Sequence, residues 1–296
     1  MREIDQVRAF LEQSAPPPGV IFSWDERRAR MNAFGAMSPL ADGWSVAPDT
    51  LAVPAERHTG PGARTDVAIL YLHGGGYCVG SAQSHRGLVS QLAAATGAQA
   101  YAIDYRLAPE HPAPAAIEDA LTALEALEAR GLPASKVIIA GDSAGGGLAL
   151  ATALRLRDAG KPMPAALYLI SPWADLTHSG RSHVFRANAD PILTTESLDT
   201  YAVAYVGDKV DRASQDASPM LADLSGLPPI LIQVGADEIL LSDSETLQAR
   251  AEAAGVMASV EIWPGMIHVW PIFYAMLSAG REAIEDAGGW MSRRWE

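Results

Sequence analysis

The chain has 296 residues, of which 49% are hydrophobic and 19% charged; this composition excludes a fully disordered protein, and α/β folds often form one unit at this length. Its formal net charge of −13 would repel nucleic-acid phosphates and anionic membranes, so neither is an expected partner. The single cysteine, Cys78, excludes an intrachain disulfide and fits a reducing compartment. Because the sequence shows neither a secretory signal nor an apolar run of about 18 residues, we expect a cytoplasmic protein.

The first 45 residues are expected to form a helical segment that is separate from the rest of the chain. Apolar residues recur at helical spacing over 3–12, and a second, strongly charged helix is predicted over 23–37. Continuous apolar runs, which suit a sheet, begin only after this segment.

Short apolar runs then alternate with helical patterns, which predicts an α/β fold with a mainly parallel central sheet flanked by helices. The strands are expected at 50–56, 67–72, 98–103, 136–140, 165–170, 229–234 and 257–263. The helices are expected at 114–130, 145–159, 242–254 and 280–294.

One interval, 177–225, contains no strand pattern and shows a helix only at 194–206. An insertion of this size above a sheet is a candidate lid. We expect it to form a small helical cap with residues 1–45, while 46–176 and 226–296 form the two parts of the core.

The sequence GDSAGG at 141–146 follows a buried strand pattern and opens a helical one. Strand, sharp turn and helix are the context of a nucleophile elbow, in which the serine hydroxyl is exposed beside a helix N-terminus. This context favours Ser143 as a nucleophile over an ordinary glycine-rich turn.

The sequence HGGGY at 73–77 directly follows the strand expected at 67–72. Three successive glycines make sense where backbone N–H groups must approach a ligand closely, as in an oxyanion hole. We expect the donors to be Gly75, Gly76 and Ala144, with His73 holding the loop. A dinucleotide-binding turn is the alternative, but Val79 stands where that pattern requires glycine.

The acid and the base of a hydrolase should follow the nucleophile in that order, each just after a strand. His268 is the only histidine after residue 183 and is the predicted base. Asp237 is the favoured acid. Glu238 and Asp243 are the alternatives, with Asp243 expected to cap the following helix or face solvent.

Four motifs together resemble the hormone-sensitive-lipase group of α/β-hydrolases, also called bacterial family IV esterases. They are HGGGY at 73–77, DYRLAPEHPAPA at 104–115, GDSAGGGLA at 141–149 and SPWADLT at 171–177. The resemblance spans roughly residues 50 to 280 and is closest to small bacterial members that hydrolyse short acyl esters. Many members carry an aspartate–proline pair at the acid position, whereas this chain has Asp237–Glu238.

The resemblance implies a serine carboxylesterase with the triad Ser143, Asp237 and His268, the same oxyanion hole, a helical cap and a small-molecule ester as substrate. It also implies that Arg106 and Glu110 brace the oxyanion loop as an ion pair. No metal or cofactor is expected. A lactone or amide hydrolase with the same triad is the alternative, and a ligand receptor of this fold, which would lack the histidine, is a remote one.

The shape of the pocket cannot be derived from the sequence, but five residues are candidate wall residues. They are Tyr77, Met37, Trp173, Trp263 and Met266. The resemblance also implies a homodimer formed through an edge strand, for which 257–263 is the candidate, with a monomer as the alternative.

Overall fold

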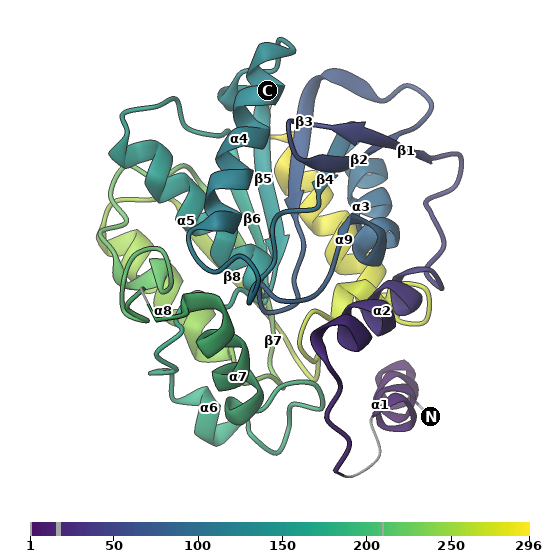
Figure 1. Ribbon diagram of the computed structural model, residues 1–296. Helices are drawn as coiled ribbons and strands as arrows, with labels where there is room; N and C mark the ends of the chain where they lie inside the picture. The colour runs from purple at the N-terminus through teal and green to yellow at the C-terminus, as the bar shows by residue number, and fades with distance from the viewer. Residues whose placement is uncertain (1, 16–18, 209) are drawn as a thin grey trace.

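The computed structural model describes residues 2–15, 19–208 and 210–296. Its centre is an eight-stranded sheet with the order β1-β2-β4-β3-β5-β6-β7-β8 (Figure 1). The strands are β1 Ser45–Thr50, β2 Pro54–Thr59, β3 Arg64–Leu72, β4 Ala98–Ile103, β5 Val137–Asp142, β6 Ala166–Ile170, β7 Ile230–Gly235 and β8 Ala258–Trp263. Strands β3 to β8 are parallel, which confirms the predicted fold class.

The strand expected at 50–56 is wrong in its boundaries, because this range spans the turn between two antiparallel strands. Strand β1 pairs with β2, and β2 pairs with β4, both antiparallel. The turn is tight, with the N–H of Leu51 donating to the carbonyl of Val53 and Ala52 at a φ of 61°. The hairpin is largely exposed on one face and therefore lacks the continuous apolar run that marks the inner strands.

Helices cover both faces of the sheet. One face packs against α3 (Ala82–Thr96) and α9 (Ser278–Ser292), and the other against α4 (Ala115–Ala129), α5 (Ala144–Asp158) and α8 (Leu241–Ala253). Alternate residues of β3 enter the two cores: Leu70 and Leu72 lie on the α5 side, and Ile69 and Tyr71 on the α3 side. Helix α3 was not predicted, because alanine, serine and glycine separate its few large apolar residues.

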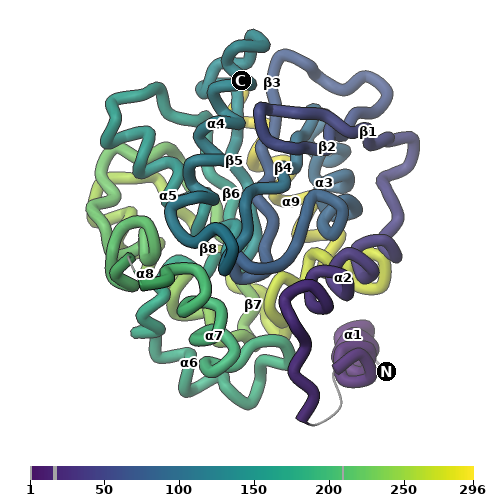
Figure 2. The backbone as a smooth tube through the Cα atoms, in the orientation of Figure 1, coloured from purple at the N-terminus to yellow at the C-terminus, as the bar shows by residue number. Residues whose placement is uncertain are grey.

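Four more helices gather at one end of the molecule (Figures 1 and 2). They are α1 (Glu3–Ser14), α2 (Trp24–Gly35), α6 (Ser182–Phe185) and α7 (Thr195–Val206). We call these helices and their connections the cap segments. Although α1 and α2 are far from α7 in sequence, residues of all three line one cavity.

The last strand, β8, lies at an edge of the sheet. Dimerisation through this edge remains a prediction. Within the described ranges, no helix has the length and apolarity needed to cross a membrane.

Candidate active site

Ser143 occupies a strained turn between β5 and α5. Its backbone has a φ of 52° and a ψ of −122°, a conformation that L-residues rarely adopt outside such elbows. A Cβ atom on Gly145 would collide with the carbonyl of Leu72, and one on Gly141 with the backbone of Gly145. The two glycines therefore allow the chain to turn within the space between β3 and α5.

His268 lies between the serine and a carboxylate. Its Nε2 is 3.0 Å from Ser143 Oγ, and its Nδ1 is 2.6 Å from Glu238 Oε2. All three residues are buried, with Glu238 fully removed from solvent. This chain of contacts has the geometry of a nucleophile, a general base and an orienting acid.

The carboxylate that contacts His268 is Glu238 and not the predicted Asp237. Asp237 is half-buried at the surface, where its Oδ2 is 3.0 Å from Nη2 of Arg8 on α1. Consecutive residues of the loop after β7 project in different directions, and the longer glutamate side chain is the one that reaches the imidazole. The second alternative, Asp243, is buried in α8 against His183 rather than exposed or capping.

Ser171, at the end of β6, holds both partners of the His268–Glu238 contact. Its hydroxyl lies 2.8 Å from Glu238 Oε1, and the backbone N–H of Val269, next to His268, donates to the Ser171 oxygen at 3.1 Å. Glu238 Oε1 also accepts from the N–H of Gly235 at 2.6 Å. Sequence reasoning missed this role, although Ser171 begins the SPWADLT motif.

The electrostatics of the pair raise the pKa of His268. Burial lowers the pKa of His268, but the charge of Glu238 and its hydrogen bond outweigh burial, so the pKa lies above its ordinary value. A raised pKa makes the imidazole a stronger acceptor for the serine proton.

The loop after β3 brings two glycines to the cavity that contains Ser143. Gly75 and Gly76 have φ values of 113° and 60° and line the same cavity as Ser143. Among the described residues, their N–H groups have no protein acceptor. Ala144 is the first residue of α5, where an N–H has no intrahelical acceptor. Two of the three predicted donors thus line the cavity that contains Ser143, and the third follows Ser143 in the chain.

Asp142 and His73 hold this loop. Asp142 Oδ1 accepts from the hydroxyl of Tyr71 at 2.7 Å and from the N–H of Gly74 at 3.0 Å. The His73 ring stacks on Tyr105 with centroids 4.2 Å apart, and its Nδ1 lies 2.8 Å from the carbonyl of Gly74. His73 therefore makes the loop contacts that the sequence led us to expect.

The predicted Arg106–Glu110 ion pair is absent from these described residues. Arg106 Nε instead donates to Asp119 at 2.9 Å, and Glu110 pairs with Arg28 of α2 at 2.6 Å. Asp119 lies on α4, whereas Glu110 lies in the turn before α4 and connects that turn to α2, one of the cap segments.

The serine and histidine open into a cavity of about 430 Å³. Apolar side chains of the cap segments and of the loop after His268 form most of its wall. They are Leu11, Met31, Phe34, Ile192, Leu193, Leu198, Val269, Ile272 and Phe273.

Of the five predicted wall residues, Trp173 lines this cavity and the other four do not. Tyr77 is buried against the ring of Tyr205, with centroids 3.7 Å apart. Met37 is exposed, whereas Trp263 and Met266 pack against the core on the α3 and α9 side. The cap supplies the wall instead, and its contacts are long-range ones that local patterns do not encode.

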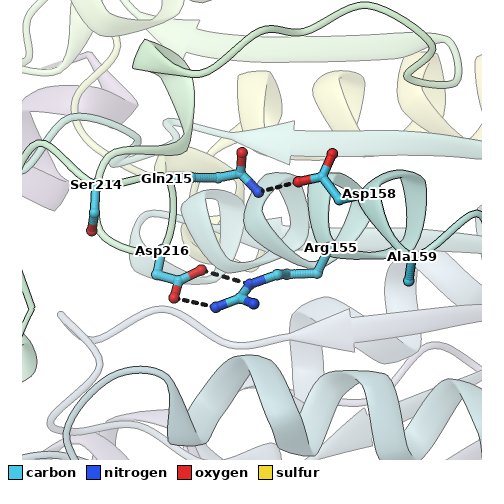
Figure 3. Close-up of a pocket in the computed structure, with 6 residues that line it drawn as sticks. All are labelled: Arg155, Asp158, Ala159, Ser214, Gln215 and Asp216. Atoms are coloured by element: carbon cyan, nitrogen blue, oxygen red, sulfur yellow. Dashed lines mark hydrogen bonds and ion pairs between the residues drawn. The ribbon is translucent and has the colours of Figure 1, made fainter.

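A second hollow lies at the surface beside α5, away from the serine (Figure 3). Its polar side chains contact one another: Arg155 pairs with Asp216, and Gln215 donates to Asp158 at 2.8 Å. Among the described residues, no three histidine, cysteine or carboxylate side chains come together as candidate metal ligands.

Comparison with known proteins agrees with the fold. The family model for the alpha/beta hydrolase fold matches residues 69–272. An acetyl-hydrolase of Streptomyces hygroscopicus is 47% identical over 231 residues, which cover 78% of this chain and 77% of that protein. An esterase/lipase from an uncultured bacterium is 44% identical with a TM-score of 0.93, covering 99% of this chain and 98% of the other.

A solved esterase of the bacterial hormone-sensitive lipase family is 41% identical with a TM-score of 0.95, again covering 99% and 98% of the two chains. The fold, the site and these relatives define a carboxylic ester hydrolase. The chain belongs to the α/β-hydrolase family and, within it, to the hormone-sensitive-lipase-like esterases.

Proposed function

We propose that this esterase cleaves short-chain carboxylic esters through an acyl-enzyme on Ser143, with His268 as general base and Glu238 as the acid that orients it. The observation that carries the proposal is the continuous chain from Ser143 Oγ through both nitrogens of His268 to Glu238 Oε2. A serine hydroxyl is a weak nucleophile until such a base removes its proton.

In the first half of the reaction, His268 Nε2 takes the hydroxyl proton while Ser143 Oγ attacks the ester carbonyl. Glu238 holds the Nδ1–H tautomer and stabilises the imidazolium. The N–H groups of Gly75, Gly76 and Ala144 stabilise the oxyanion, an effect worth about 3–4 kcal/mol for one such donor elsewhere. The imidazolium then protonates the alcohol, which leaves.

In the second half, water loses a proton to the same histidine and attacks the acyl group. The resulting tetrahedral intermediate collapses, the carboxylic acid is released, and the imidazolium returns its proton to Ser143 Oγ. These steps use only the side chains and backbone groups named above.

A preference for short acyl chains is supported by the family of the chain and by the relative named as an acetyl-hydrolase. Cap residues also limit the cavity to about 430 Å³.

The test is hydrolysis of p-nitrophenyl acetate, butyrate, octanoate and palmitate by the wild type, Ser143→Ala and the control Ser214→Ala from the surface hollow. We expect kcat/KM to fall with chain length in the wild type and control, and to fall by about 10³-fold or more in Ser143→Ala. Equal activity of Ser143→Ala and wild type would reject the nucleophile. If the wild type is inactive on all four esters, the alternatives become a lactone or amide hydrolase, or a non-catalytic ligand receptor of this fold.

A further inference from the structure

One cation lies on the wall of the active-site cavity. Arg27, on α2, lines the cavity together with Ser143 and His268, and it is the only arginine or lysine among the described lining residues. Asp142 also borders the cavity, but its Oδ1 already accepts from Tyr71 and Gly74. The cavity therefore combines an apolar wall with a single fixed positive charge.

The guanidinium of Arg27 is held in one orientation by neutral groups. Its Nε donates to the carbonyl of Phe22 at 3.1 Å, and its Nη1 to the hydroxyl of Tyr201 at 3.2 Å. It also lies over the rings of Trp24 and Tyr201, at 5.1 and 5.6 Å from their centroids. The remaining N–H groups of the fork have no acceptor within the described ranges.

Arg27 differs from its neighbour in having no acid. Arg28 pairs with Glu110 and Asp25, whereas no carboxylate of the described residues lies within 4.0 Å of Arg27. Removing a cation from water without an anion is unfavourable. A half-buried, unpaired guanidinium in a chain of net charge −13 is therefore suited to an anion that arrives with the ligand.

Tyr201 connects this cation to the reacting end of the cavity. A Cβ atom on Gly76 would collide with the Tyr201 ring, so that ring lies directly on the oxyanion loop. The opposite end of the same side chain, its hydroxyl, contacts Arg27. A substrate with its carbonyl at Ser143 can thus extend along Tyr201 toward the guanidinium.

We propose that Arg27 forms an anion subsite and that the substrates of this esterase include short acyl esters whose alcohol part carries a carboxylate. This inference rests on the proposed function. If the acyl group is small, the alcohol part must occupy most of the cavity and meets Arg27. The planar guanidinium fork matches a carboxylate in bidentate geometry.

The chemistry at Ser143 is unchanged by this subsite. The bond between the acyl carbon and the alcohol oxygen breaks, the acyl group passes to Ser143 Oγ, and the alcohol leaves with the proton from His268. The carboxylate stays on the alcohol product and does not react. The negative surface of the protein opposes the approach of such substrates, but salt screens that repulsion beyond about 8 Å at physiological ionic strength.

The test compares matched substrates that differ only in charge. Acetate release is measured from ω-acetoxy carboxylates, from the propanoate to the octanoate, and from the corresponding neutral ω-acetoxy carboxamides. The enzymes are the wild type, Arg27→Gln, Arg27→Lys and the control Arg30→Gln. Arg30 lies on the same helix over the ring of Phe22 and is not part of the cavity wall.

At the chain length that spans the cavity, we expect Arg27→Gln to lower the carboxylate-to-carboxamide ratio of kcat/KM by about 10- to 100-fold, mainly through KM. This range corresponds to a hydrogen bond between charged groups. Arg27→Lys should keep part of the ratio because it keeps the charge, and Arg30→Gln should keep all of it.

An unchanged ratio in Arg27→Gln at every chain length would overturn the proposal. Equal losses on both substrates would also overturn it, because Arg27 would then only brace Tyr201. Failure of the wild type to hydrolyse even the neutral carboxamide esters would instead reject the proposed function itself.

Discussion

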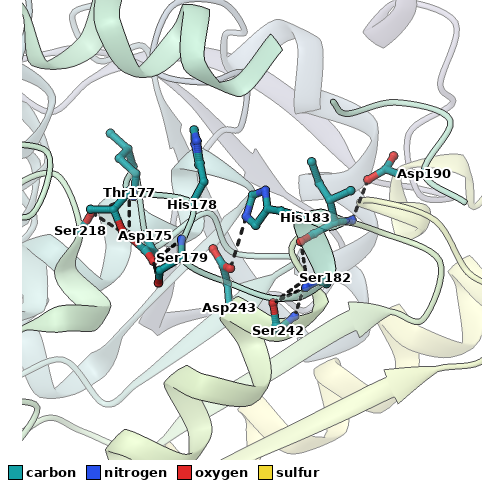
Figure 4. Close-up of polar contacts among 12 residues, drawn as sticks. Asp175, Thr177, His178, Ser179, Ser182, His183, Asp190, Ser218, Ser242 and Asp243 are labelled. Atoms are coloured by element: carbon teal, nitrogen blue, oxygen red, sulfur yellow. Dashed lines mark hydrogen bonds and ion pairs between the residues drawn. The ribbon is translucent and has the colours of Figure 1, made fainter. Parts of the chain in front are cut away.

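Two buried histidine–carboxylate pairs take their carboxylates from the loop after β7 and from the first turn of α8, and they differ in how completely their polar atoms are paired. In the first, Glu238 receives hydrogen bonds from His268, Ser171 and Gly235. In the second, Nε2 of His183 on α6 and Oδ1 of Asp243 on α8 are 3.7 Å apart, an ion-pair distance too long for a hydrogen bond, and neither side chain has a hydrogen-bond partner among the described residues (Figure 4).

The two pairs also differ in how the pKa of one member is shifted. The pKa of Asp243 is raised to about 6, mainly by burial. The charges of Asp175 and Glu238 also raise this pKa, and His183 only partly offsets the rise. Around the triad, by contrast, Glu238 outweighs burial and raises the pKa of His268. Proximity of a histidine and a carboxylate therefore does not define a catalytic pair; the surrounding donors and the adjacent nucleophile do.

The second pair belongs to the junction between a cap segment and α8. In Figure 4, Ser182 and Ser242 contact each other beside it, with their hydroxyl oxygens 2.6 Å apart. Asp190 accepts from the N–H of Ile239 at 3.0 Å. These contacts connect residues 182–190 to the segment that follows Glu238.

Replacing the histidine of each pair should give the largest difference in activity between the two pairs. We expect His268→Gln to lower kcat/KM for p-nitrophenyl acetate by about 10⁴-fold or more, because serine loses its base. His183→Gln should lower it by about 3-fold or less. Steady-state kinetics measures both, and similar losses in the two variants would show that the pairs are not functionally distinct.

Asp243→Asn should stabilise the protein at neutral pH. With a folded pKa near 6 and an unfolded value near about 4, the folded state binds more protons between these pH values. The free energy of unfolding should therefore fall as the pH rises from about 4 to about 6 in the wild type. The asparagine variant should lack this fall and gain about 1–3 kcal/mol at pH 8.

Urea unfolding at pH 4 and pH 8 measures this effect, with Asp237→Asn as a control at the half-exposed carboxylate. If the free energy of unfolding changes between pH 4 and pH 8 to the same extent in the wild type and in Asp243→Asn, the assignment is contradicted.

Ser171→Ala tests the support of the first pair. The change removes one donor to Glu238 and the acceptor of the Val269 N–H, so we expect kcat/KM to fall by about 10-fold. Ser182→Ala, at the junction of the second pair, should leave kcat/KM within about 2-fold of the wild type. Equal effects of the two serines would contradict the role of Ser171.

The sequence predicted the parts of the site that depend on local pattern. Ser143 lies in a strand–turn–helix context that local residues define, and His268 was selected by order along the chain. The inner strands appeared as apolar runs because both of their faces are buried.

The parts that depend on long-range contacts could not be predicted. Asp237 and Glu238 are adjacent acids, and only the path of the loop decides which of them faces His268. The exposed hairpin of β1 and β2 has no continuous apolar pattern, and the burial of Asp243 depends on packing against α6. The Arg27–Tyr201 contact joins residues of two cap segments that no local motif relates.

The most direct test of the central claim compares Glu238→Gln with Asp237→Asn in kcat/KM for p-nitrophenyl acetate across pH. We expect Glu238→Gln to lose about 10³- to 10⁴-fold and Asp237→Asn about 3-fold or less. Because Glu238 raises the pKa of His268, the acid limb of the remaining Glu238→Gln activity should move to lower pH. A large loss in Asp237→Asn with a nearly active Glu238→Gln would contradict the account and restore Asp237 as the acid.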